Sequence, residues 1–166
     1  MTFVRDMGEA YRSHITMVRG RALRILGVEA AAQDVAQETF MKLLEYRRKG
    51  ISEDNTAAFL YRAATNLALN RLRDAKRRQE LLEEQASHTS PSASDPTDRP
   101  ALRRILGLVG REEAEIAIYY YVDGMEQEEI AELLQMERRT VGRRLERFCA
   151  KAQKLLGLST ENHSND

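Results

Sequence analysis

All three prolines of this 166-residue chain lie between residues 91 and 100, and their placement limits where regular structure can form. Small polar residues and prolines dominate residues 87–100, and they bury too little apolar surface to offset the entropy lost on ordering. On either side, apolar residues recur at steps of three and four, as in amphipathic helices. The sequence therefore predicts an all-α protein of two small helical domains, joined by a flexible linker over residues 85–100.

The front domain is expected over residues 1–84 and the rear domain over residues 101–158, followed by a tail over residues 159–166. Apolar spacing and glycine stops predict helices in both domains. Their expected ranges are residues 6–26, 29–49, 57–84, 101–108 and 111–122, with two more helices after the break at Asp123 and Gly124.

The rear domain ends in the pattern of a helix-turn-helix. Residues 124–134 form a short amphipathic stretch, Gln135 and Met136 a tight connection, and residues 137–145 the start of a second helix with a basic face. The second helix of such a pair is the one that enters the major groove of DNA. This pattern favours a protein that reads duplex DNA.

Charge is segregated along the rear domain, although the formal net charge of the whole chain is zero. Residues 111–137 carry nine acidic residues and one arginine, whereas residues 138–156 carry seven basic residues and one acid, a net charge of +6. Such a basic helix binds phosphates with an affinity that falls with salt. Arg138, Arg139 and Arg143 lie where a recognition helix reaches base edges, and arginine pairs with guanine.

A second basic cluster lies in the latter half of the third expected helix, at Arg71, Arg73 and residues 76–78. It follows Phe59, Tyr61, Asn66 and Asn70, and aromatic rings interleaved with amides and arginines suit single-stranded nucleic acid. The alternative is that both rings belong to the core.

Several classes of function lack support in the sequence. One cysteine and three scattered histidines provide neither a disulfide framework nor metal-ligand spacing. No nucleophile and base pair indicates an enzyme, and no cofactor motif is found. No stretch approaches the length of a membrane span, and the N-terminus lacks a signal peptide. We expect a cytoplasmic protein.

Two stretches of the front domain carry the motifs of a known family. Residues 34–43, Asp-Val-Ala-Gln-Glu-Thr-Phe-Met-Lys-Leu, match a D-x-x-Q-E-x-F helix, and residues 58–73 match a W-L-Y-R-I-A-R-N-L-A-x-D-x-L-R stretch. The rear domain places Glu129-Ile130-Ala131 and Thr140-Val141 in a matching register. The chain resembles bacterial sigma factors of the extracytoplasmic-function group, with their region two helical bundle followed by their region four helix-turn-helix.

This resemblance implies a protein that binds core RNA polymerase, directs it to promoter DNA and needs no cofactor. The residues it assigns to core polymerase are Asp34, Gln37, Glu38 and Phe40. Those it assigns to the melted minus-ten element, with the loop at residues 47–56 and a flipped base beside that loop, are Arg62, Asn66, Asn70, Arg73 and Arg77. Those it assigns to the minus-thirty-five element are Arg138, Arg139, Thr140, Arg143, Arg144 and Arg147. An anti-sigma factor or other regulator is a common partner in the family.

The chain departs from the family pattern at four neighbouring positions. Ala31 and Gln33 stand where acids are common, which predicts a weaker polymerase contact or one that a regulator strengthens. Gln135 stands at the usual glycine of the helix-turn-helix connection and Glu137 at its cap. Because residues other than glycine strain at positive φ, an altered turn is expected, although Glu137 suits the helix dipole.

Two other functions fit parts of the pattern. One is a two-domain helix-turn-helix regulator that binds duplex DNA without opening promoters, and it is motivated by Ala31 and Gln33. The other is a helical adaptor that binds protein through the acidic face of the rear domain.

A hypothesis for regulation concerns Thr39 and Ser52. Phosphate on either residue would supply the negative charge that is missing because Ala31 and Gln33 stand in place of acids.

Overall fold

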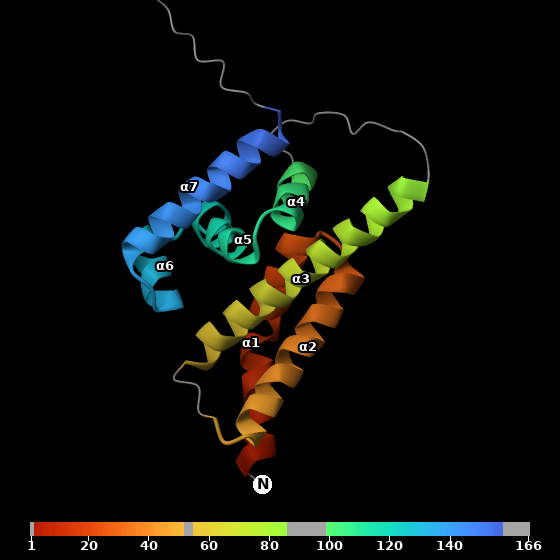
Figure 1. Ribbon diagram of the computed structural model, residues 1–166. Helices are drawn as coiled ribbons and strands as arrows, with labels where there is room; N and C mark the ends of the chain where they lie inside the picture. The colour runs from red at the N-terminus through yellow and green to blue at the C-terminus, as the bar shows by residue number, and fades with distance from the viewer. Residues whose placement is uncertain (1, 52–54, 86–98, 158–166) are drawn as a thin grey trace, which may run out of the picture. The chain divides into compact units, whose positions relative to one another are not determined.

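The computed structural model describes residues 2–51, 55–85 and 99–157, and they form helices without a strand (Figure 1). The all-α prediction is therefore confirmed for these residues. The chain divides into two compact units, Met1–Ala75 and Lys76–Asp166. No described helix has the length and apolar character that a membrane crossing requires. The expected linker, apart from its ends, and the expected tail lie outside the described residues.

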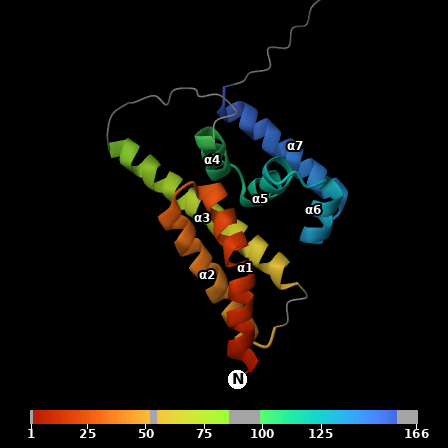
Figure 2. The same cartoon turned by 180° about the vertical axis from the view of Figure 1, so that it is seen from behind.

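Three helices build the first unit: α1 (Thr2–Leu26), α2 (Glu29–Arg48) and α3 (Thr56–Gln85). They run up, down and up, as both views show (Figures 1 and 2). The predicted stops are confirmed, because Gly27, directly after α1, and Gly50, two residues after α2, adopt positive φ values of 72° and 70°. Left-handed backbone at the end of a helix favours glycine.

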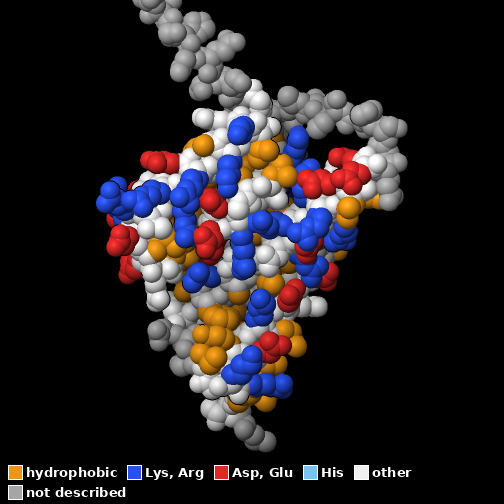
Figure 3. Space-filling model, viewed as in Figure 1, with side chains coloured by type: hydrophobic (Ala, Val, Ile, Leu, Met, Phe, Trp, Pro, Cys, Tyr) orange, Lys and Arg blue, Asp and Glu red, His pale blue; other side chains and the backbone are white. Residues whose placement is uncertain are grey.

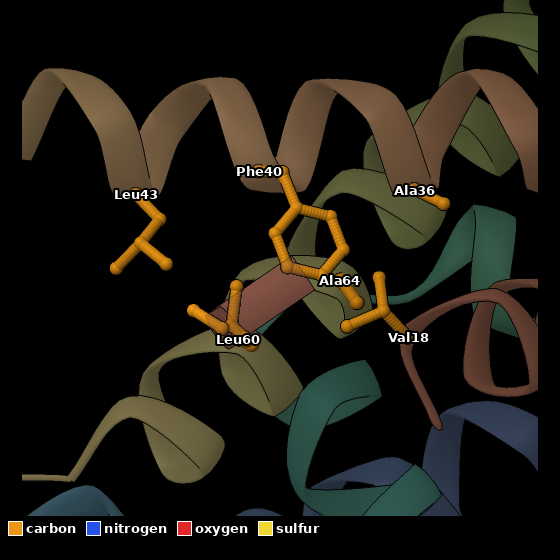
Figure 4. Close-up of a cluster of buried hydrophobic side chains, with 7 residues drawn as sticks. Val18, Ala36, Phe40, Leu43, Leu60 and Ala64 are labelled. Carbon is orange, nitrogen blue, oxygen red and sulfur yellow. The ribbon is translucent and has the colours of Figure 1, made fainter. Parts of the chain in front are cut away.

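Apolar side chains from all three helices form the core of the first unit (Figure 4). They come from one stripe of each helix, as amphipathic helices require. The labelled members are Val18 on α1, Ala36, Phe40 and Leu43 on α2, and Leu60 and Ala64 on α3. Burial of these side chains fixes the rotation of each helix about its own axis.

Arg47 joins the ends of the three helices around the loop that connects α2 to α3. Its guanidinium donates to Asp6 Oδ2 on α1 at 3.0 Å and to Thr56 Oγ1 on α3 at 3.2 Å. Asn55 accepts a hydrogen bond from the backbone N–H of Ala58 at 3.1 Å and so caps α3. Residues 52–54 of the loop lie outside the described residues.

The second unit holds the end of α3 and four further helices: α4 (Arg99–Leu108), α5 (Arg111–Ala117), α6 (Gln127–Leu134) and α7 (Arg138–Leu155). Helix α7 packs against α5 and α6. The largest fully buried side chains here include Tyr119, Ile116, Ile130 and Val141. The structure places the start of α4 at Arg99, two residues earlier than the sequence pattern indicated.

The helix predicted over residues 111–122 is not uniform. After α5 the chain forms a π-helical turn over Ile118–Val122, in which Asp123 N–H donates to Ile118 O at 3.1 Å. The wider turn shifts the side-chain register, so Ile118 and Tyr119 are buried while Tyr121 is exposed. The buried Tyr119 hydroxyl donates to Glu115 Oε1 at 3.0 Å. Apolar spacing alone did not reveal this register shift.

The core of the first unit makes a quantitative prediction for α3. Leu60 is 0% exposed, whereas Leu82 on the same helix is 66% exposed. We expect Leu60→Ala to lower the free energy of unfolding by about 2–5 kcal/mol, through lost burial and the cavity it leaves. Urea unfolding of the full chain, followed by circular dichroism, measures the change. Leu82→Ala is the matched control and should shift stability by less than about 0.5 kcal/mol; equal losses in both variants would contradict the assigned core.

Candidate polymerase and nucleic-acid interfaces

Helix α2 turns a polar stripe away from the core of the first unit. Asp34, Gln37 and Met41 are exposed, and Glu38 is half-buried. Their spacing of three, four and seven residues places them on one face of the helix. Met41 is 55% exposed, and sequence reasoning missed it as a member of this face. Glu38 also pairs with Arg71 of α3 at 3.2 Å.

Phe40 differs from the other three residues expected to contact polymerase. It is only 7% exposed and belongs to the core cluster, with its ring 4.9 Å from that of Tyr11. It therefore offers almost no surface to a partner, and its physical role in this structure is to hold α2 in place. A motif position alone does not reveal whether a side chain faces the core or solvent.

The phosphorylation hypothesis fails at Thr39. This side chain is fully buried, and its hydroxyl donates to Val35 O at 2.7 Å. A phosphate there would require α2 to leave the core, so the site cannot serve as an accessible switch on the folded unit. Ser52, the other residue of the hypothesis, lies outside the described residues.

Helix α3 carries the residues expected to meet the melted strand. Arg62, Asn66, Asn70 and Arg73 are half-buried, and Arg77 is exposed. Steps of three and four residues align all five along one side of the helix. Asn66 Oδ1 has no hydrogen-bond partner within the described part of the chain. Asn66 Oδ1 is itself buried, so the stripe presents guanidinium donors together with the accessible parts of the two asparagine amides.

The two aromatic residues of α3 make contacts inside the first unit. Phe59 packs against the core cluster, and its ring lies 5.0 Å from that of Tyr46. Tyr61 lies under the buried Arg21, whose guanidinium carbon is 4.4 Å from the ring centroid. Arg21 also donates to Thr65 Oγ1 at 2.9 Å. These contacts favour the core alternative for both rings and brace α3 next to Arg62 and Asn66.

A groove of about 690 Å³ lies along the first two turns of α7. Arg138, Arg139 and Arg143, all expected to bind DNA, line it together. The other lining residues are Gln127, Gly142 and Glu146, which sequence reasoning missed. Helical spacing could have found two of them, because Gly142 and Glu146 follow Arg138 at steps of four and so share its face of the helix. Basic side chains gather over α7, with acidic ones among them (Figure 3).

The other residues expected on the recognition helix lie outside this groove. Thr140 is half-buried and Arg147 is exposed. Arg144 pairs with Glu112 of α5 at 2.9 Å, so its charge is turned toward its own unit. Helix rotation explains the separation, because residues 140, 144 and 147 lie on the side of α7 opposite Arg138 and Gly142.

Acidic residues of the unit neutralise part of the basic helix. Arg138 pairs with Glu128 of α6 at 2.7 Å, and Lys151 pairs with Glu113 of α5 at 3.7 Å. The acidic and basic segments that the sequence kept apart are therefore packed against each other. The Arg138–Glu128 pair is exposed on both sides, and such surface pairs contribute about 0–1 kcal/mol. A DNA phosphate can replace Glu128 at low cost.

The connection between α6 and α7 keeps a left-handed residue without glycine. Gln135 has φ 53° and ψ 48°, and Met136 N–H donates to Ala131 O at 2.9 Å, which closes the turn. The expected alteration of this turn is therefore wrong: glutamine adopts the conformation that glycine would favour. Glu137 occupies the N-cap position, as predicted, but its side chain makes no capping hydrogen bond.

Tyr121 and Cys149 form a polar contact at the side of the second unit. The tyrosine hydroxyl lies 3.0 Å from Cys149 Sγ. This hydrogen bond, with partial burial, raises the pKa of Tyr121 to about 12. The hydroxyl thus stays protonated across the neutral range, and the Phe148 ring packs 5.9 Å from that of Tyr121. The pair links the π-helical turn to α7.

Comparison with known proteins matches each part of the chain to a region of the same protein family. The family Sigma-70 region 2 matches residues 10–78, and the family Sigma-70, region 4 matches residues 100–151. A chain in the co-crystal structure of the sigma factor RpoE with the anti-sigma factor NepR from Bartonella quintana shares the fold, with a TM-score of 0.51 and 18% identity over 93% of this chain and 99% of that chain. No curated relative matches the chain.

Fold and matched regions together define a transcription initiation factor. The chain belongs to the sigma-70 family of sigma factors and has the region 2 and region 4 architecture of the extracytoplasmic-function group. It binds core RNA polymerase and promoter DNA and directs transcription initiation. The region 2 match favours this function over a regulator that cannot open promoters and over a helical adaptor. Sigma factors in general are not enzymes.

The turn at Gln135 generates a stability prediction. Left-handed backbone costs a residue with a Cβ about 1–2 kcal/mol, so Gln135→Gly should raise the free energy of unfolding by about 1 kcal/mol. Gln153→Gly is the matched control, because Gln153 is exposed within α7 and its replacement should cost about 1 kcal/mol. Urea unfolding of both full-length variants measures the difference. Equal destabilisation by the two changes would contradict strain at Gln135.

Proposed function

We propose that residues 1–84 act as a region 2 domain, residues 101–158 as a region 4 domain, and residues 85–100 as the linker between them. The first domain docks on polymerase and holds the melted minus-ten element, while the second reads the minus-thirty-five element. The family matches at residues 10–78 and 100–151 support this division. The protein contributes binding and strand opening rather than catalysis, and it works in the cytoplasm with the polymerase.

The polymerase-binding surface of this proposal is the exposed face of α2. Asp34, Gln37 and Glu38 supply carboxylate and amide groups, and Met41 supplies an apolar centre. Polar groups around an exposed apolar side chain suit a protein interface with a small apolar core. Phe40 stabilises this surface from beneath. Ala31 and Gln33, at the start of the helix, lower its negative charge, so electrostatic attraction contributes less to docking.

The minus-ten surface is the stripe of α3 from Arg62 to Arg77. Single-stranded DNA is held by cations along its backbone and by contacts to its unstacked bases. Arg62, Arg73 and Arg77 supply the cations, while the amides of Asn66 and Asn70 can hydrogen-bond to base edges. The observation that supports this role is the alignment of these five residues on one side of a helix braced by Arg21.

The minus-thirty-five surface is the groove along α7. Arg138, Arg139 and Arg143 face base edges from it, and Arg147 contacts phosphate beside it. Thr140 and Arg144 lie outside the groove, on the other side of α7, and contribute to phosphate binding after Arg144 exchanges Glu112 for DNA. Exchange of exposed ion pairs for phosphate makes the affinity strongly dependent on salt.

A protein regulator is also part of the proposal. The structural relative was crystallised with an anti-sigma factor, and the shared fold supports a partner of the same kind for this chain. Such a partner would compete with polymerase or DNA for the faces of α2, α3 or α7.

A substitution in the polymerase-binding face tests the central role. Met41→Arg places a bulky cation at the centre of the α2 face, and we expect core polymerase to bind at least about tenfold more weakly, or about 1.4 kcal/mol. Run-off transcription with purified core should fall in parallel. Ser13→Arg adds the same charge at an exposed position of α1 and serves as the matched control. Wild-type binding by the Met41 variant would contradict this use of α2.

Loss of an arginine inside the groove and loss of one outside it should change DNA binding in different ways. Arg143→Ala should weaken binding to the preferred upstream element by about 5- to 150-fold and relax base preference there, because a bidentate base contact is lost. Arg147→Ala should weaken binding about equally for all sequences and reduce the slope of log affinity against log salt by about one. Fluorescence anisotropy of holoenzyme on promoter variants measures both. Identical behaviour of the two variants would contradict the assignment of the groove to base reading.

A further inference from the structure

One acidic side chain lies among the arginines of the α7 groove. Glu146 lines this groove with Arg138, Arg139 and Arg143, and it is exposed. Residues 138–156 carry seven basic residues and one acidic residue, which is Glu146. A carboxylate at a surface that meets DNA opposes phosphate binding, so its position requires a physical explanation.

Glu146 differs from the acids that neutralise the basic helix. Glu112, Glu113 and Glu128 each form an ion pair with a basic residue of α7. Within the described residues, by contrast, Glu146 has no hydrogen-bond or ion-pair partner, although arginines line the same groove. Its carboxylate therefore remains available to a donor from outside the chain.

Gly142 lies one turn before Glu146 and presents no side chain to the groove. A Cβ atom added there would meet only the Oε1 atom of Gln127, at 3.4 Å. Because Gly142 has no side chain, a base edge that displaces the flexible end of Gln127 can come close to the helix between Arg138 and Glu146.

We infer that Glu146 is a specificity-determining residue that accepts a hydrogen bond from the N4 amine of cytosine in the upstream promoter element. This inference rests on the proposed role of the groove. In the major groove cytosine presents an amine donor, guanine and thymine present acceptors, and adenine places its N7 acceptor beside its amine. A carboxylate is therefore attracted to cytosine, repelled by guanine and thymine, and only partly satisfied by adenine.

The experiment is selection of active promoters from a library randomised across the upstream element, with full-length protein and core polymerase. Wild-type protein should enrich cytosine at one position, by about tenfold over guanine. Glu146→Ala should remove this preference, and Glu146→Gln should change it to adenine, since glutamine pairs with the N6 and N7 atoms of adenine. Because Glu146 is exposed, both variants should keep the wild-type thermal unfolding midpoint.

Glu132→Gln removes the same charge from an exposed position of α6 outside the groove and should leave every base preference unchanged. Cytosine enrichment that persists in both Glu146 variants would overturn the inference, as would its absence from the wild type. In either case, preferences that still change with Arg143→Ala would leave the proposed function intact. Failure of wild-type protein to select any promoter would instead overturn the proposed function together with this inference.

Discussion

Burial of one apolar stripe on α2 determines what the first unit can present to a partner. Val35, Phe40 and Leu43 pack into the core and fix the rotation of the helix. Because 100° separates successive residues of a helix, that rotation turns Asp34 and Met41 outward. The core and the face that we propose for polymerase binding are thus two sides of one helix. Stability and function depend on the same packing, and a change in the core would also displace the face.

In the second unit the same helices provide both the apolar packing and the ion pairs. Val141 and its apolar neighbours hold α7 against α5 and α6, while Glu112 and Glu128 pair with arginines that the sequence assigns to DNA. The Glu128 pair is exposed on both partners and the Glu112 pair on its acidic partner; such surface pairs stabilise little, so DNA can replace them. They nevertheless reduce the positive charge of the free protein, so non-specific DNA binding is weaker than the sequence charge of α7 alone suggests.

Much of the fold could be predicted from the sequence, because apolar spacing and glycine stops are local signals. The family motifs indicated the two sigma regions. Tertiary information was needed for the rest. The register shift at Ile118 accompanies the burial of Tyr119, and no short pattern encodes it. Gln135 keeps a turn that favours glycine because the packing of α6 against α7 outweighs about 1–2 kcal/mol of strain. The core position of Phe40 and the groove position of Glu146 depend on neighbours distant in sequence.

The central claim is that the two helical units grip separate promoter segments while α2 binds the polymerase. Hydroxyl-radical footprinting of the protein with core polymerase on a promoter tests this claim most directly, combined with permanganate probing for unpaired thymines. The account predicts two protected segments upstream of the start site and reactive thymines in the downstream one. Protection of a single duplex segment with no reactive thymine, unchanged when polymerase is omitted, would contradict it.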